Sequence, residues 1–250
     1  MSSLEIRSTL IRGWISNHQF FMLKKSHCIP GGAFLVLGKT ERKKSTGMAR
    51  IDDYIESRRI AVERLREDSF ADILSRSGFE KADQNRFRVS FLNRTYLVNF
   101  PEFEFLDDSE KTKEVSIQEQ ILILHYMASP TYAGSTGNWI SYREISGASF
   151  YFSTFVKRAI DPLKKVFGQD IFKLAKPAET IQGQWIDTGD AGYEFQIFPK
   201  VAMQLILWGG DDEFSPEANI IFNDTIGEML SPEDVAWVAG MLVYRLIALA

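Results

Sequence analysis

The sequence predicts an α+β fold, a single domain in which helices pack on a largely antiparallel sheet and which ends in a C-terminal helix. Three observations support this class: residues 50–77 have helical spacing of apolar side chains, residues 86–100 alternate polar and apolar side chains, and several strand-like segments follow one another within residues 193–222. Strands that succeed one another without intervening helices usually pair antiparallel. Residues 48–250 contain no internal repeat or low-complexity linker, so we expect one domain.

The first expected elements are a helical segment and a hairpin. Residues 50–77 are amphipathic and end at Gly78, which predicts one helix or a helical pair. Residues 86–92 and 94–100 alternate on either side of Asn93. This pattern predicts a hairpin with one solvent-exposed face.

Two further helices are expected in the middle of the chain. Ser116 and Glu119 have the spacing of a capping box and open the first of them. Its following residues, 121–127, are apolar on nearly every side, which indicates a buried helix. Residues 149–167 predict the second helix, bent or divided at Pro162.

The last part of the chain predicts three strands and a helix. The strands are expected at residues 193–198, 201–208 and 219–222. Ser231 is placed to cap the final helix, and Pro232 takes its first position. Glu233 and Asp234 then face the positive end of the helix dipole, and the largely apolar residues 235–249 complete the helix.

The composition excludes several classes of protein. With one cysteine, Cys28, the chain has no internal disulfide and no zinc or iron–sulfur site of four thiolates, so a reducing cytoplasm is the expected location. No apolar run reaches the roughly 18 residues that cross a bilayer. The Lys and Arg residues after position 47 are scattered. We therefore expect neither a membrane nor a nucleic-acid partner.

The charge is distributed unevenly. Residues 1–47 hold 8 Lys and Arg against 2 Asp and Glu, whereas residues 48–250 hold 21 against 31, a balance of −10. The basic first segment has the composition of an organelle transit peptide, and its Gly38-Lys39-Thr40 resembles the end of a phosphate-binding loop without the required glycine spacing. Because the helical pattern begins at Met48, we expect residues 1–47 to be a disordered or non-native extension and residues 48–250 to be the domain.

Several short motifs resemble a known family. They lie at residues 122–127, 137–145, 167–168, 189–191 and 207–214. Together these motifs resemble the domain of unknown function numbered 3786, over about residues 52–246. The resemblance implies an anaerobic bacterial or archaeal host. It also implies an iron–sulfur protein as a candidate partner, since some relatives carry an iron–sulfur segment beside this domain; it implies no reaction.

His125 is the first candidate site residue. It is the only histidine in residues 48–250, and its neighbours in sequence are apolar. Such an imidazole can be the axial ligand of a haem or corrinoid, or a neutral core residue that hydrogen-bonds a backbone carbonyl. Histidine acid–base catalysis in the domain would depend on this residue alone.

The acidic turn Asp211, Asp212 and Glu213 is the second candidate, with Trp208 and Phe214 on either side. Clustered carboxylates suit a divalent cation such as Ca²⁺ or Mg²⁺, and aromatic side chains beside a polar loop suit a ligand site. Solvent-exposed turns are also commonly acidic without any such role.

The third candidate is the segment that contains Trp139, Arg143 and Glu144. Ser141 and Glu144 repeat the capping-box spacing after a loop that contains Gly134. Arg143 can bind the carboxylate or phosphate of a ligand, or pair with a neighbouring carboxylate as a structural contact.

Two functions therefore remain open. The first is a small-molecule or cofactor-binding accessory module in anaerobic metabolism, which draws on His125 and on the segments of Trp139 and Trp208. The second is an enzyme in which Arg143 holds an anionic substrate. Its acid or base would be one of the carboxylates Glu144, Asp211, Asp212 and Glu213. A site shared by the two segments requires that they lie within about 10 Å of each other.

Overall fold

The computed structural model describes residues 47–110, 112–129 and 135–250. The predicted extension up to residue 46 and the loop position Gly134 lie outside the described residues. Contacts along the chain divide it into two units, residues 1–53 and 54–250, which are described separately. Of the first unit, only the beginning of helix α2 (Gly47–Leu65) is described. The domain boundary at residue 48 stays a prediction.

Sheet A of the second unit is a four-stranded antiparallel meander. Its strands, in spatial order, are β1 (Glu80–Asp83), β2 (Arg86–Phe91), β3 (Arg94–Asn99) and β4 (Phe105–Asp107). In β2 the side chains of Phe87, Val89 and Phe91 are buried, while those between them are exposed. The predicted hairpin with one solvent-exposed face is confirmed.

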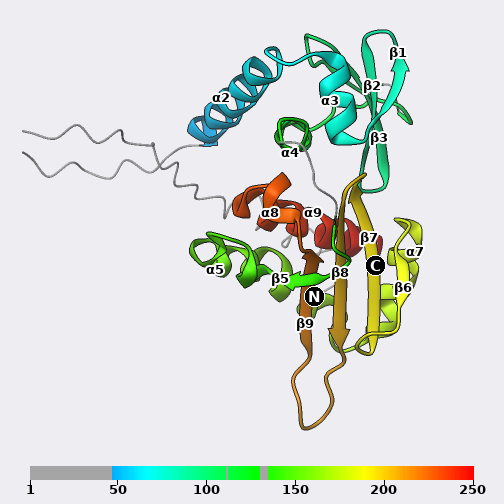
Figure 1. The fold of residues 1–250 in the computed structure, drawn as a ribbon. Helices are drawn as coiled ribbons and strands as arrows, with labels where there is room; N and C mark the ends of the chain where they lie inside the picture. Colours follow the sequence, from blue (N-terminus) through cyan, green and yellow to red (C-terminus); the bar gives the residue numbers. More distant parts are fainter. Residues whose placement is uncertain (1–46, 111, 130–134) are drawn as a thin grey trace, which may run out of the picture. The chain divides into compact units, whose positions relative to one another are not determined.

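Sheet B has five antiparallel strands (Figure 1). In spatial order they are β5 (Trp139–Ser141), β9 (Glu217–Asn223), β8 (Val201–Trp208), β7 (Ala191–Phe198) and β6 (Gln184–Ile186). The backbone N–H of Leu92 donates to the carbonyl of Ile197 at 2.9 Å, which joins the two sheets. The predicted α+β class is confirmed, with two antiparallel sheets in place of one.

The helices lie before, between and after the strands. After α2 they are α3 (Phe70–Ser77), α4 (Ile117–Met127), α5 (Phe152–Phe155), α6 (Asp161–Phe167), α7 (Ala175–Thr180), α8 (Ile226–Met229) and α9 (Pro232–Leu249). Short 3₁₀ helices span Tyr142–Glu144, Ala148–Phe150 and Ile171–Leu174. Gly78 ends α3 in the left-handed conformation, with φ of 72°, so residues 50–77 form the predicted helical pair. None of the described helices is long and apolar enough to span a bilayer.

A π-helix interrupts the predicted third helix. It spans Val156–Ile160 and lies between α5 and α6, directly before Pro162 in the first turn of α6. Pro162 has no backbone N–H to donate, so the chain cannot keep regular α-helical bonding through this point. The expected segment is therefore divided, but at Val156–Ile160 and not at Pro162, which lies in the first turn of α6.

Helix α9 forms much of the core of the second unit. Ser231 accepts a hydrogen bond from the N–H of Asp234 at 3.2 Å, and Pro232 occupies the first turn, as predicted. The residues of α9 are buried over most of its length, and the helix packs against α5, α6, α7 and the π-helix. Most of the helix from Asp234 onward therefore lies inside the unit, whereas Pro232 and Glu233 are only partly buried.

Candidate functional site

The structure gathers five ionisable side chains around the first turn of α9. They are His125, Tyr151, Arg158, Glu233 and Asp234, and we call them the acid–base cluster. They come from four elements, since α4 supplies the histidine, the turn before α5 the tyrosine, the π-helix the arginine and α9 both carboxylates.

His125 and Asp234 form the centre of the cluster. The imidazole Nδ1 lies 3.0 Å from Oδ1 of Asp234. The other carboxylate oxygen, Oδ2, accepts a hydrogen bond from the Ser231 hydroxyl at 2.7 Å. The histidine side chain is 33% exposed and the aspartate side chain 8%. The carboxylate is thus fixed by the helix cap, and it orients an imidazole that reaches solvent.

This pairing determines which nitrogen of His125 is available. The Asp234 carboxylate accepts at Nδ1, so Nδ1 carries the proton and Nε2 has the free lone pair when the ring is neutral. Within the described part of the chain, no hydrogen bond is made at Nε2. Burial lowers the pKa of the ring, but the hydrogen bond and charge of Asp234, together with the charge of Glu233, outweigh it and raise the pKa above its usual value.

Glu233 is the second unusual group of the cluster. Burial raises its pKa to about 7, and the neighbouring charge of Asp234 acts in the same direction. Tyr151, Arg158 and His125 oppose this rise without cancelling it. Among the described residues, nothing hydrogen-bonds to its buried Oε1 atom. A carboxyl group with this pKa exchanges its proton near neutral pH, which is the range of general acid–base chemistry.

The π-helix places Arg158 against the cluster. Burial lowers the pKa of this guanidinium, while the charge of Glu233 raises it. Each π-helical turn holds more residues than an α-helical turn, so the interruption changes which side chain faces α9. Tyr142 lies next to the cluster. Its hydroxyl donates to the carbonyl of Pro232 at 2.7 Å, and its ring stacks on Phe155 at 4.2 Å.

The predicted segment of Trp139, Arg143 and Glu144 lies on either side of Tyr142 in sequence. Trp139 is in strand β5, and the guanidinium carbon of Arg143 lies 3.5 Å from the ring centre of Phe152. Glu144 accepts from the backbone N–H of Ser141 at 2.7 Å, which completes the predicted capping box. Arg143 therefore stacks on an aromatic ring, and the Glu144 carboxylate is occupied by a local cap.

The predicted turn of Asp211, Asp212 and Glu213 lies at the other end of sheet B. Trp208 pairs with Glu217 at one end of β9, whereas Trp139 pairs with Asn223 at the opposite end. Six residues of strand separate these positions, or roughly 20 Å. The structure does not bring the Trp208 and Trp139 segments together.

The acidic turn has a local structural explanation. Oδ1 of Asp211 accepts from the backbone N–H of Glu213 at 2.9 Å and of Phe214 at 2.6 Å. These bonds close the turn and lower the pKa of Asp211. Among the described residues, no group of three or more His, Cys, Asp or Glu side chains is arranged to hold a metal ion. The divalent-cation interpretation of this turn therefore has no support from geometry.

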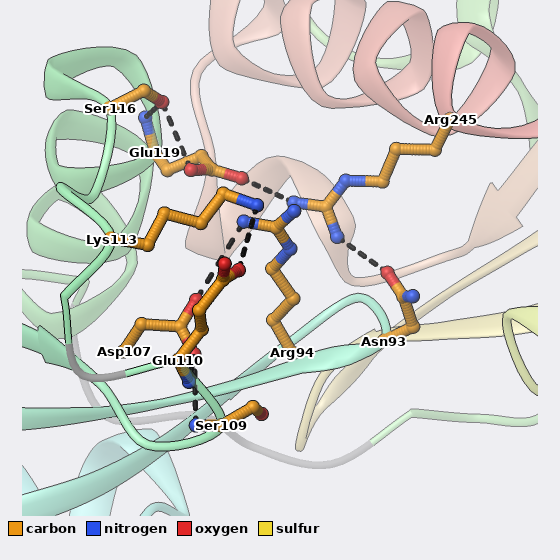
Figure 2. Close-up of polar contacts among 9 residues, drawn as sticks. All are labelled: Asn93, Arg94, Asp107, Ser109, Glu110, Lys113, Ser116, Glu119 and Arg245. Carbon is orange, nitrogen blue, oxygen red and sulfur yellow. Dashed lines mark hydrogen bonds and ion pairs between the residues drawn. The ribbon is translucent and has the colours of Figure 1, made fainter. Parts of the chain in front are cut away.

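A second polar cluster joins sheet A to α4 and α9 (Figure 2). Arg245 donates to Asn93 Oδ1 at 2.7 Å and forms an ion pair with Glu119. Beside it, Nη1 of Arg94 lies 3.7 Å from Oδ2 of Asp107. Both carboxylates are buried and both have a cationic partner, which is the arrangement expected of structural ion pairs.

Helices α4 and α9 are consequently joined at both ends. Glu119 in the first turn of α4 pairs with Arg245 near the end of α9, and His125 near the end of α4 pairs with Asp234 in the first turn of α9. The two helices therefore run in opposite directions. The two ion pairs fix α4 against α9 at both ends, which holds the His125 imidazole next to the Asp234 carboxylate.

Comparison with known families adds one finding. Residues 69–245 match a family model described as Domain of unknown function (DUF3786). The chain belongs to the DUF3786 family. The resemblance predicted from the motifs is confirmed, and the matched range contains every residue of the acid–base cluster. No curated protein and no solved structure matches the chain.

One of the five cluster residues of this DUF3786 chain was a candidate from the sequence. His125 stood out as the single histidine of residues 48–250. Glu233 and Asp234 were assigned to the helix dipole, and Tyr151 and Arg158 had no distinguishing signal. Two adjacent carboxylates in a strongly capped first turn are the one pattern from which part of the cluster could have been inferred.

Proposed function

We propose that this DUF3786 domain is a small-molecule or cofactor-binding accessory module whose ligand contacts the exposed edge of His125. The observation that carries this proposal is the His125–Asp234 pair, in which a buried carboxylate fixes Nδ1 and leaves Nε2 available. Histidines that bind metal centres commonly donate their other ring N–H to a carboxylate, which orients the ring and raises its basicity. The same arrangement also suits hydrogen bonding to a simple organic ligand.

The residues fit the axial-ligand role suggested by the sequence. His125 would hold the metal of a haem or corrinoid through Nε2, and Asp234 would orient the ring. Such a group supplies redox or group-transfer chemistry when bound. Anaerobic metabolism and an iron–sulfur protein partner are consistent with the family resemblance and belong to the same proposal.

The test is native mass spectrometry and absorbance spectroscopy of the full chain after anaerobic purification. We expect an added mass in the wild-type protein, its loss in His125→Ala and its retention in the matched control His27→Ala. A bound species that survives His125→Ala would contradict the proposal. If the wild-type protein emerges without added mass, titration with haem and with cobalamin replaces the first step, and equal uptake by His125→Ala and wild type would again contradict the axial-ligand role.

Glu233 favours a second candidate function, an enzyme that acts on an anionic small substrate. Its pKa of about 7 allows it to donate or accept a proton at neutral pH, and Arg158 provides a positive charge in the same cluster. In this second function Glu233 takes the acid–base role for which the sequence offered Glu144, Asp211, Asp212 and Glu213. Calorimetry in buffers of different ionisation enthalpy, compared between wild type and Glu233→Gln, tests the second function, because proton exchange by Glu233 predicts a buffer-dependent heat that the variant loses.

A further inference from the structure

A concave site lies along helix α2 and the turn that follows it. It is a groove of about 460 Å³ between α2 and the segments that contain Glu102 and Ile117. This volume is within the range of small-molecule sites. The groove shares no residue with the acid–base cluster, so the inference below is independent of the proposed function.

Two arginines of the groove are fixed by neutral acceptors. Arg58 donates from Nε to Gln120 Oε1 and from Nη2 to the carbonyl of Phe103, both at 2.6 Å. Arg66 donates from Nε to the carbonyl of Pro101 at 3.1 Å. Among the described residues, neither guanidinium is in an ion pair, and both Nη atoms of Arg66 and Nη1 of Arg58 donate to no group. The two side chains are therefore oriented while donors stay available.

The carboxylates near Arg58 and Arg66 are directed elsewhere. Arg59 forms ion pairs with Glu56 and Glu63, so these two carboxylates act on Arg59, and among the described residues no carboxylate forms an ion pair with Arg58 or Arg66. Burial lowers the pKa of Arg58; the charge of Glu104 opposes this effect and that of Arg66 adds to it. Glu102 is exposed and is the one remaining carboxylate that lines the groove. Two like charges that are close enough to affect each other favour the binding of an anion.

Apolar side chains lie next to these donors. Ile55, Val62 and Ile117 line the groove together with the arginines. We propose that the groove binds a small organic anion, whose carboxylate or phosphate contacts Arg58 and Arg66. Its apolar part packs on the three aliphatic side chains.

The test uses phenyl phosphate, benzoate, inorganic phosphate and benzyl alcohol as probes of the full chain. Binding is followed through the Nε–Hε NMR signals of the arginines. We expect saturable shifts with phenyl phosphate or benzoate, and the tighter of the two identifies the preferred anionic group. Inorganic phosphate and benzyl alcohol each lack one half of the proposed ligand, so either one binding as tightly as the better aromatic anion would overturn the proposal.

Three charge variants predict the direction and the size of the change in affinity. Arg66→Gln should weaken the better probe by about tenfold, the usual effect of losing a charge-assisted hydrogen bond. Arg64→Gln, the matched control two residues away at the end of α2 and outside the groove, should leave binding unchanged. Glu102→Gln should tighten binding by about threefold, the factor for removing a like charge roughly 6 Å away in an exposed site. Equal loss in Arg64→Gln and Arg66→Gln, or weaker binding in Glu102→Gln, would overturn the proposal, provided that circular dichroism shows native folding.

Discussion

The imidazole of His125 and the carboxylate of Asp234 are 109 residues apart in sequence and 3.0 Å apart in the fold. The carboxylate is buried and is held by the cap of α9, while the imidazole reaches solvent. A buried acceptor that orients an accessible ring is the arrangement needed to present one nitrogen in a defined direction. The predictions below test this pair and the packing that positions it.

Asp234→Asn should lower the pKa of His125. The substitution removes the carboxylate that stabilises the imidazolium, while burial still disfavours the charge. Because the folded pKa of His125 is raised, its contribution to stability is complete below the unfolded pKa and is lost as pH rises through the folded pKa. The variant should therefore lose about 1–2 kcal/mol of unfolding free energy near pH 5.5 and less near pH 8.5.

An NMR titration of the His125 ring and urea unfolding at both pH values measure these effects. Asp212→Asn is the matched control, because Asp212 is exposed in the hairpin turn. An unchanged His125 pKa in Asp234→Asn would show that the hydrogen bond does not control the ring.

Glu233→Gln should stabilise the protein at alkaline pH. The folded pKa of Glu233 is about 7, above its unfolded value, so the wild-type protein loses stability as pH rises between these two values. Glutamine has no charge to bury, and we expect a gain of about 1–2 kcal/mol near pH 8.5 after allowance for partial solvent screening. Near pH 4 the gain should vanish. Urea unfolding at the two pH values measures the difference, and Glu213→Gln is the exposed control; equal effects at both pH values would refute the assigned pKa.

The ion pair between Glu119 and Arg245 should show strong coupling. Arg245→Met or Glu119→Gln alone should cost about 2 kcal/mol, because each leaves the partner's largely buried charge without its ion pair. The double variant should lose less than the sum of the two. A double-mutant cycle by urea unfolding measures the coupling, and the exposed pair of Arg59 and Glu63 should show much weaker coupling because solvent screens it. Additive effects would mean that the contact contributes no stability of its own.

Gly192→Ala should destabilise the domain by about 2–3 kcal/mol. A Cβ atom at this position in β7 would lie 2.5 Å from the carbonyl oxygen of Thr188 and 2.9 Å from that of Ile186. Both obstacles are backbone atoms that cannot rotate away. Gly227→Ala is the control, since its Cβ would meet only a methyl carbon of Ile145 at 3.3 Å. Thermal unfolding compares the two variants, and equal melting temperatures would refute the steric argument.

Local sequence signals predicted the elements whose stabilising contacts are themselves local. Helix α9 begins where Ser231 and Pro232 indicated, and strand β8 has the predicted bounds. The short strands β1, β4, β5 and β6 were not predicted. In β1 the first three of four residues are exposed, so no apolar alternation marks it, and it exists because β2 offers a hydrogen-bonding partner.

The site was predictable only in part. His125 could be singled out because it is polar among buried neighbours. Its partner could not, since a contact across 109 residues leaves no periodic trace. Arg158 was hidden for a different reason: it lies in the π-helix Val156–Ile160, and a regular helical period does not predict which way the side chains of a π-helix face.

The long separation of the two central residues also has a consequence for synthesis. At typical rates of about 5–20 residues per second, translation of the 109 residues from His125 to Asp234 takes roughly 5–20 seconds. During that interval the nascent chain carries an imidazole without its carboxylate. A ligand that needs the oriented ring can be captured only after α9 has left the ribosome and docked, so loading should follow translation of the domain rather than accompany it.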